Sequence, residues 1–205
     1  MSQKNKGIYR LISIAFFYSL IQRIISATSF REKIIKKYIT KHNVNVKVLD
    51  VGCGPAEILI VLRNIRYYGF DINPNYINSA KKKYEGRGKF FCKRFTSKDI
   101  RNLPKFDHIL LLRILHHLSD EEANTLISNI KKVLKKNGNL ITQDNTFTKN
   151  QNFIAKFLVQ MDKGNNVRLK NGYLNILKKH FKKINSKIYH QKFIPYTYFV
   201  TNCRN

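Results

Sequence analysis

A short segment near residue 50 places one acidic residue and two glycines in the order Asp50, Gly52 and Gly54. Glycine lets the backbone approach a bound molecule closely, because it has no side chain to stand between them. A second acidic residue, Asp71, follows another apolar run. Since carboxylates accept hydrogen bonds, the two acids and the glycine turn predict a site for a ligand with several donor groups.

Two adjacent histidines, His116 and His117, are the side chains best suited to remove a proton at neutral pH. Adjacent residues point in different directions, so at most one is expected to face a pocket, and we favour His117. The alternative is that both histidines are structural and hold their loop in place. Asp144 could orient a second substrate, or it could form a turn with Asn145.

Alternating strands and helices are needed to bring these residues together, and the hydrophobic pattern predicts them. Strands are expected over residues 47–51, 67–72, 89–95, 106–112, 140–143, 184–193 and 196–203. Helices are expected over residues 55–63, 73–84, 119–136, 151–161 and 171–182, after two helices within 8–41. This order predicts an α/β fold with a doubly wound, mostly parallel seven-stranded sheet and an antiparallel strand at the C-terminus.

A single domain is expected over residues 1–205, with an N-terminal helical lid over 1–43 and an α/β core over 44–205. The apolar run 11–21 is too short to span a bilayer, and its spacing fits an amphipathic helix that packs as part of the lid. No signal peptide is evident, and the three cysteines have neither metal-ligand spacing nor an even count. We therefore expect a cytoplasmic protein with no metal site.

The net charge of +27 favours partners such as phosphate backbones or anionic lipid surfaces. Lysines within 131–136 and 178–183, however, lie opposite apolar residues at helical spacing, as solvated helix faces require. The sequence is also rich in Lys, Asn and Ile, whose codons are A/T-rich. Genome composition and solvated faces are therefore the favoured explanation, and nucleic acid remains the second choice of partner.

In doubly wound sheets, ligands bind beyond the carboxyl ends of the strands. The glycine turn lacks the third glycine of a dinucleotide fingerprint, since Glu57 stands there, and no Lys-Ser/Thr pair follows Gly54 as in a P-loop. Asp71 ends the second expected strand, where an acid can accept hydrogen bonds from both ribose hydroxyls. These features indicate an adenosine-containing cofactor.

With these motifs the chain resembles the class I S-adenosylmethionine-dependent methyltransferases. The resemblance rests on VLDVGCGPAEIL, YYGFDINPNYINSAKKKY, FDHILLLRILHHLSDEEANTLISNIKKVLKKNGNLIT and IPYTYFV, and covers nearly everything from residue 47 on. The chain is also similar to a small bacterial group of mostly unassigned substrate that shares a segment like MDKGNNVRLKNGYLNIL and an N-terminal helical lid. The resemblance implies a Rossmann-like fold, S-adenosylmethionine as cofactor and S-adenosylhomocysteine as product.

The resemblance also implies roles for single residues. Asp50 would organise the first cofactor loop, Asp71 would hold the ribose hydroxyls, and Ile72 would pack on the adenine. The implied cofactor-binding residues are Asp50, Gly52, Cys53, Gly54, Asp71, Ile72, Phe95, Leu112 and Arg113. Arg94 departs from the pattern, because many relatives have there an acid that accepts from the adenine amine, and arginine cannot accept a hydrogen bond. Either Phe95 and backbone groups suffice, or the alignment of this segment with the family is shifted by one or two positions.

Methyl transfer from a sulfonium needs alignment above all, and a base only where the acceptor holds a proton. The candidate catalytic residues are His117, His116 and Asp144. Asp162 and Arg168 could bind a polar or anionic substrate, or form a structural salt bridge with each other. The segment LRIL stands where amino-methyltransferases of adenine or glutamine carry an N/D-P-P-Y/F motif, which disfavours that chemistry.

Three functions remain open from the sequence. The first is methyl transfer to a small molecule or glycan precursor, which the absence of an added recognition domain favours. The second is RNA methylation, for which the charge is the main argument, and a basic stripe leading into the pocket would support it. The third is a non-catalytic or membrane-associated protein that keeps the fold, for which a cofactor pocket blocked by Arg94 would be a sign.

Overall fold

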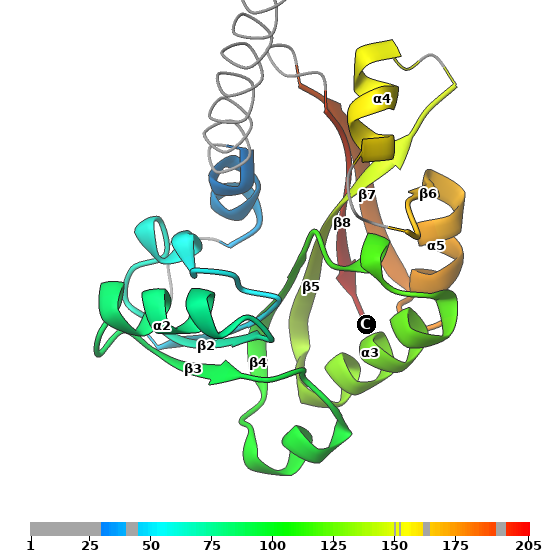
Figure 1. Ribbon diagram of the computed structural model, residues 1–205. Coiled ribbons are helices and arrows are strands. Elements are labelled where there is room, and N and C mark those ends of the chain that lie inside the picture. Colours follow the sequence, from blue (N-terminus) through cyan, green and yellow to red (C-terminus); the bar gives the residue numbers. More distant parts are fainter. Residues whose placement is uncertain (1–29, 40–44, 150, 152, 162–164, 192–195) are drawn as a thin grey trace, which may run out of the picture.

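The computed structural model describes residues 30–39, 45–149, 151, 153–161, 165–191 and 196–205 (Figure 1). The strands are β1 Val46–Val51, β2 Ile65–Asp71, β3 Gly88–Cys92, β4 Phe106–Leu112, β5 Leu134–Phe147, β6 Arg168–Leu169, β7 Lys183–His190 and β8 Thr197–Arg204. The α-helices are α2 Pro74–Lys83, α3 Asp120–Val133, α4 Phe153–Met161 and α5 Lys170–Lys178, and residues 30–38 are also helical. Short 3-10 helices are η1 Glu57–Ile60, η2 Ser97–Asn102 and η3 Leu115–His117.

Seven of the strands form one continuous path in the order β3-β2-β1-β4-β5-β8-β7, and the short β6 pairs with β5. The neighbours from β3 to β5 are parallel, whereas β8 is antiparallel to both β5 and β7. The expected α/β class, the mostly parallel sheet and the antiparallel C-terminal strand are therefore confirmed. The two-residue β6 is an addition that the hydrophobic pattern did not predict.

Strand order reverses at β1, since the chain proceeds from β1 to β2 and β3 on one side and then returns to β4 on the other. Asp50 of β1 pairs with Gly69 of β2 and with Leu110 of β4, so the three strands end near one another. A ligand site is expected at such a switch point, beyond the carboxyl ends of the strands.

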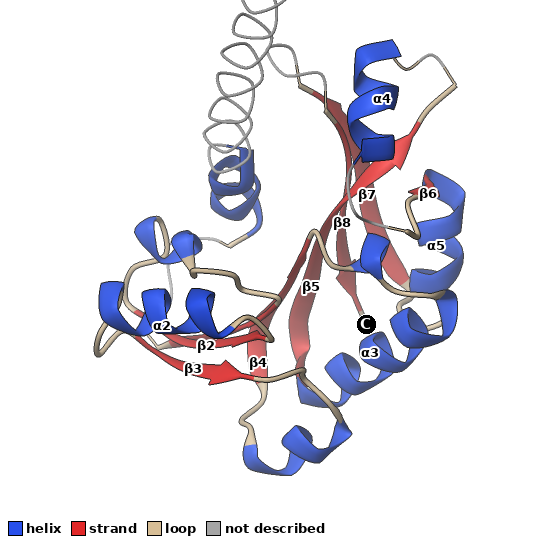
Figure 2. Cartoon of the chain, in the orientation of Figure 1, coloured by secondary structure: helices blue, strands red, loops and turns tan. Residues whose placement is uncertain are grey.

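Helices cover both faces of the sheet, as Figure 2 shows. On one face, Ile34 and Ile35 of the 30–38 helix pack with Val48 and Leu110 of the sheet. On the other face, buried side chains of α3 and α5 pack against the sheet; they include Ile127, Ile130, Ile176 and Leu177. Two buried cores therefore hold β1 and β4 from both sides, which makes the site end of these strands rigid.

The helix expected over 55–63 is wrong in type and length, because only the 3-10 helix η1 forms there. Gly54, Ala56 and Asn64 all have positive φ, at 56°, 55° and 57°. A left-handed residue ends a right-handed helix, so the segment can hold only a single short turn. The predicted helix is replaced by a compact loop after β1.

The helix expected over 119–136 ends earlier, at Val133, and β5 occupies residues 134–147 instead of 140–143. The register of β4 and β5 shifts between Phe106 and His108, so the strands pair again only from Asn139. A Cβ on Gly138 would lie 2.9 Å from the Asp107 carbonyl oxygen and 3.0 Å from that of Phe106. Gly138 therefore permits close passage of the two strands and does not end the helix.

Within the described ranges, no helix is both long enough and apolar enough to cross a membrane. Most of the expected lid, residues 1–29 and 40–43, lies outside the described residues. Of that segment, the helix at 30–38 is described, and its buried Phe30 stacks on Tyr198 with ring centroids 5.0 Å apart.

Candidate functional site

The loop after β1 is shaped by its two glycines. The amides of Gly52 and Cys53 donate to the carbonyl oxygen of Phe70, at 2.7 and 3.0 Å. Gly52 has a φ of 76°, and a Cβ there would lie 2.0 Å from Cδ1 of Ile114. Gly54 has a φ of 56° with no atom near its virtual Cβ. Gly52 is therefore required by both conformation and space, whereas Gly54 is required by conformation alone.

Asp71 ties this loop to the end of β2. Its Oδ2 accepts from the Gly54 amide at 2.8 Å, and its Oδ1 accepts from the Asn73 amide at 2.8 Å. A carboxylate has about four lone-pair sites, so two remain for a ligand. Asp71 thus organises the loop and keeps the capacity to accept from ligand hydroxyls.

Asp50 lies beneath the loop, with 3% of its surface exposed, and accepts a 2.7 Å hydrogen bond from the hydroxyl of Tyr67. Burial raises the pKa of Asp50 to about 6, although the Tyr67 hydrogen bond and the charge of Arg31 act in the opposite direction. Burial likewise raises the pKa of the Cys53 thiol. Cys53 therefore stays protonated at neutral pH and provides an apolar wall, not a nucleophile.

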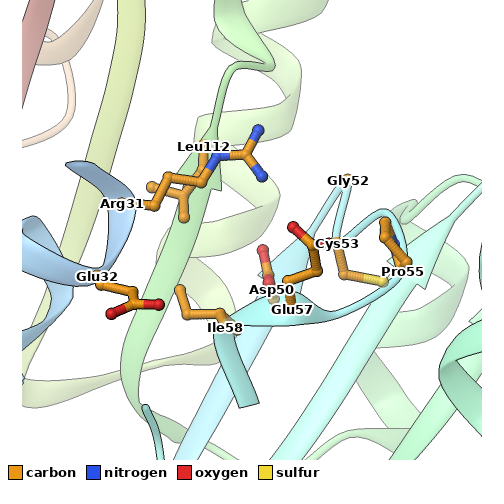
Figure 3. Close-up of a pocket in the computed structure, with 9 residues that line it drawn as sticks. All are labelled: Arg31, Glu32, Asp50, Gly52, Cys53, Pro55, Glu57, Ile58 and Leu112. Carbon is orange, nitrogen blue, oxygen red and sulfur yellow. The ribbon is translucent and has the colours of Figure 1, made fainter. Parts of the chain in front are cut away.

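A narrow pocket of about 20 Å³ opens above Asp50, between the loop and the 30–38 helix (Figure 3). Its lining residues are Arg31, Glu32, Asp50, Gly52, Cys53, Pro55, Glu57, Ile58 and Leu112. Arg31 reaches across from the helix toward the side on which Asp50 lies. Because this volume holds only about one water molecule, a larger group enters only when the flexible Arg31 side chain turns aside.

Arg31 brings a positive charge into this pocket. Burial and the nearby charge of Arg113 lower the pKa of Arg31, and the charge of Asp50 partly offsets them. Its buried Nε has no hydrogen-bond partner in the described part of the chain. The pocket therefore combines a cation able to bind a carboxylate with acids, Asp50 and Glu57, able to attract an ammonium group.

A larger cavity of about 570 Å³ lies on the other side of Gly52, which lines both pockets. It is bounded by the ends of β1, β2 and β3 and by the first turns of α3. Its lining residues are Val51, Gly52, Phe70, Asp71, Ile72, Lys93, Arg94, Phe95, Thr96, Ser97, Ile114, His117, Leu118, Glu121, Glu122, Thr125, Leu126 and Asn129. This volume is typical of a small-molecule site, and the 67% exposed Ile72 gives it an apolar edge.

Arg94 does not fill this cavity. Its Nη1 lies 3.3 Å from Oε1 of Glu122, and its side chain is 69% exposed. Glu122 also completes the capping box of α3. Its Oε2 accepts from the Ser119 amide at 3.0 Å, and the Glu122 amide donates to Ser119 Oγ. Arg94 therefore lies at the rim of the cavity in an ion pair. The cofactor pocket blocked by Arg94, which would have indicated a non-catalytic protein, is not found.

The two histidine rings lie against each other, with centroids 4.1 Å apart, but only His117 of the two lines the cavity, in line with the expectation that at most one faces a pocket. His117 is exposed and lines the large cavity, whereas His116 is fully buried. Nδ1 of His116 lies 2.8 Å from Oδ1 of Asp144, and its backbone amide donates to the same oxygen at 3.1 Å. Asp144 lies inside β5, not after it, and its carboxylate holds η3 instead of forming a turn with Asn145.

Arg168 holds the same loop from another side. It donates to Asp120 Oδ1 at 2.8 and 2.6 Å, and to the carbonyl oxygens of Leu115 and Leu118 at 2.8 and 2.7 Å. Its donors are thus engaged by the protein, which favours the structural interpretation of Arg168. Its carboxylate partner is Asp120, and Asp162, the partner considered from the sequence, lies outside the described residues.

The end of β4 is joined to β5 next to the narrow pocket. Arg113 has a φ of 66°, and its amide donates to the Gln143 carbonyl oxygen at 2.6 Å. Leu112 pairs in register with Gln143, whose side-chain amide is buried and has no hydrogen-bond partner within the described ranges. Gln143 lines neither pocket, so its unpartnered amide is a cost within β5 beside the end of β4.

Sequence reasoning missed Arg31 and Glu122. Arg31 lies in a helix before the first strand, and nothing in its spacing connects it with Asp50. Glu122 lies in the first turn of α3, and nothing in its spacing connects it with Arg94.

Comparison with known proteins places this geometry in a family. The profile of a family described as a methyltransferase domain matches residues 42–193. The chain is 32% identical over 123 residues to phosphoethanolamine N-methyltransferase of Plasmodium falciparum, covering 56% of this chain and 45% of that one. It is 37% identical over 101 residues to O-methyltransferase 12 of Dictyostelium discoideum, covering 47% and 27%. The chain thus spans less than half the length of these two curated relatives.

Solved structures show the same fold. Magnesium protoporphyrin IX methyltransferase from Synechocystis, with bound S-adenosylhomocysteine, aligns with a TM-score of 0.67 at 19% identity, over 88% of this chain and 84% of that one. N-methyltransferase NodS from Bradyrhizobium japonicum aligns with a TM-score of 0.64 at 15% identity, over 88% and 98%.

Proposed function

We propose that this chain, which belongs to the methyltransferase-domain family, transfers a methyl group from S-adenosylmethionine to a small-molecule acceptor. The family expected from the sequence, the class I S-adenosylmethionine-dependent methyltransferases, is confirmed by the profile match, and its Rossmann-like fold by the structural likeness. The observation that carries the proposal is the pair of pockets that meet at Gly52. The narrow pocket carries charged side chains that suit an amino-acid group, and the large cavity has the size and the apolar lining that suit a nucleoside.

The large cavity would hold the adenosine end. Asp71 would accept from the ribose hydroxyls with the lone pairs that its two backbone hydrogen bonds leave free. Ile72 and Phe95, which line the same cavity, would pack on the two sides of the adenine. These assignments agree with the roles that the resemblance implied.

The narrow pocket would hold the amino-acid end. Arg31 would bind the carboxylate, and the acids Asp50 and Glu57 would face the ammonium group. Gly52, Cys53 and Gly54 would let the backbone follow the ligand closely. Leu112 and Arg113, at the end of β4, would then lie near the reacting methyl group.

When bound, the cofactor supplies an electrophilic methyl group, so alignment of the acceptor accounts for most of the rate acceleration. His117 would remove the proton of a protonated acceptor, because its ring faces the cavity. His116 and Asp144 would act as positioning residues that hold η3, since each is buried and bonded to the other.

Charge distribution supports a small acceptor over RNA. Lysines occupy the last turns of the helices, namely Lys81, Lys82 and Lys83 of α2, Lys131 and Lys132 of α3, and Lys178 of α5. These turns lie at the end of the sheet away from the cavity, whose mouth instead holds Glu121 and Glu122 from the first turn of α3. The lysine and the arginine that line the described cavity are both paired with acids, Lys93 with Asp99 and Arg94 with Glu122. RNA methylation remains the second candidate because of the net charge of +27.

The named relatives support the same choice. Phosphoethanolamine N-methyltransferase and indole glucosinolate O-methyltransferase 5 of Arabidopsis thaliana carry the names of small acceptors. A glycan precursor is a further member of this class of acceptor.

Calorimetric titration with S-adenosylmethionine and S-adenosylhomocysteine tests the proposal. We expect micromolar binding that Asp71→Ala abolishes and that Glu85→Ala, an exposed acid outside both pockets, leaves unchanged. Absence of binding to the unaltered protein at millimolar ligand would contradict the proposal. Radiolabelled methyl transfer to total RNA, but not to a metabolite extract, would overturn the choice of a small acceptor.

A further inference from the structure

The large cavity contains a carboxylate whose position on α3 the cofactor assignments above do not use. We propose that Glu122, held by Arg94 and Ser119, is the residue that selects adenine as the base of the cofactor by accepting a hydrogen bond from its amine. The inference rests on the proposed function, because it assumes that the cavity holds the adenosine end.

Adenine carries an exocyclic amine, which is a hydrogen-bond donor and needs an acceptor when buried. At the β3 end of the cavity, Lys93 and Arg94 cannot accept, and Thr96 and Ser97 offer neutral hydroxyl oxygens, which are weaker acceptors than a carboxylate. The acids that line this cavity are Asp71, Glu121 and Glu122. Because Asp71 is already assigned to the ribose hydroxyls, the carboxylates available for the amine are those of α3.

Glu122 is oriented before any ligand enters. Its Oε2 accepts from the Ser119 amide at 3.0 Å, and Arg94 Nη1 lies 3.3 Å from its Oε1. These interactions, the Ser119 backbone hydrogen bond first, lower the pKa of Glu122 and keep it ionised. A carboxylate that receives two donors retains about two acceptor sites, which is enough for one amine.

Glu121 is the alternative on the same turn. Within the described ranges it makes no hydrogen bond or ion pair, so its side chain would lose rotamer freedom on binding. Glu122 has already lost that freedom. The ion pair of Glu122 with Arg94 also joins α3 to the loop after β3 across the mouth of the cavity. A glutamate that served only to cap the helix would need only its hydrogen bonds with Ser119.

The experiment compares two ligands that differ in one group. S-inosylhomocysteine has a carbonyl oxygen in place of the adenine amine, so it loses the donor and presents an acceptor to the carboxylate. We expect the unaltered protein to bind S-adenosylhomocysteine roughly tenfold to a hundredfold more tightly than this analogue in calorimetric titration, as a charged hydrogen bond implies. Glu122→Gln should reduce the ratio to about threefold or less, because an amide can also donate to the carbonyl oxygen.

Glu121→Gln is the matched control, since it removes the same charge from the same turn and should keep the full ratio. Glutamine at position 122 also preserves the capping box, so the helix should remain folded, which circular dichroism verifies. If Glu122→Gln weakens both ligands equally, or if Glu121→Gln is the variant that lowers the ratio, the inference is wrong while the proposed function stands. If the unaltered protein binds neither ligand, the proposed function fails, and the inference fails with it.

Discussion

The amide of Gly54 donates a 2.8 Å hydrogen bond to Oδ2 of Asp71, which joins the loop after β1 to the end of β2. The same carboxylate receives the Asn73 amide through its other oxygen. One side chain thus sets the positions of two loops that border the large cavity. The shape of the site consequently depends on contacts between strands and not on either loop alone.

Gly52→Ala should destabilise the protein more than Gly54→Ala. Both positions have positive φ, which costs a residue with a Cβ about 1–2 kcal/mol. At Gly52 the Cβ would also lie 2.0 Å from Ile114 Cδ1, so the total loss should be about 2–4 kcal/mol. Urea denaturation measures both. In an Ile114→Ala background the two glycine substitutions should cost nearly the same, and a persisting excess at Gly52 would show that the clash with Ile114 is not its cause.

Arg31→Gln should weaken binding of the amino-acid end of the cofactor and leave the nucleoside end unaffected. Loss of a charged hydrogen bond predicts roughly a tenfold or greater drop in affinity for S-adenosylhomocysteine. Binding of 5′-methylthioadenosine, which lacks the amino-acid group, should not change. Calorimetry measures both, and Lys33→Gln, an exposed cation on the same helix, serves as the control. Equal weakening of both ligands would place Arg31 outside the amino-acid pocket.

Stability should fall as pH rises through the titration of Asp50. The folded pKa is raised by burial to about 6 from the ordinary value of 3.8, so the unfolded chain ionises first. Folding therefore becomes less favourable between about pH 4 and 6, by up to about 3 kcal/mol, and then levels off. Asp50→Asn should lack this decrease. Urea denaturation at pH 4.5 and pH 7 measures it, and an identical pH dependence in the variant would contradict the assignment.

His116→Ala should unfold more easily than His117→Ala. Removing the His116 ring leaves the buried Asp144 carboxylate with the backbone amide of residue 116 as its remaining donor, which should cost about 1–3 kcal/mol. His117 is exposed at the cavity, so its removal should change the melting temperature little. Differential scanning calorimetry compares the two. His116→Asn tests the cause, because an amide donor to Asp144 should recover part of the loss.

The strands of the site were predictable because their residues are buried in continuous apolar runs. Residues 106–112 were expected as a strand and form β4, and the first strand differs by one residue. The end of α3 was not predictable, because Lys135 and Lys136 continue a helical pattern of polar residues, whereas Leu134 before them and Asn139 after them pair with β4. That pairing is a tertiary contact, and tertiary contacts override local preference.

The residues proposed for the site show the same difference between local and tertiary information. Asp50, Gly52, Gly54 and Asp71 were found because a strand and a turn place them within one motif. Arg31 was not, since only the packing of the 30–38 helix on the sheet brings it to Asp50. Glu122 was not, since its relation to Arg94 exists only between α3 and the β3 loop.

Arg168 connects the loop that carries His117 to a part of the chain far away in sequence. The carbonyl oxygens that it holds, those of Leu115 and Leu118, belong to the loop that carries His117, and they precede it by 53 and 50 positions. The support of this loop is therefore a long-range contact, whereas Gly54 and Asp71, which join the loops after β1 and β2, are only 17 positions apart. Local opening of the segment around residue 168 would release the loop of His117 from Arg168 and leave the loops after β1 and β2 joined.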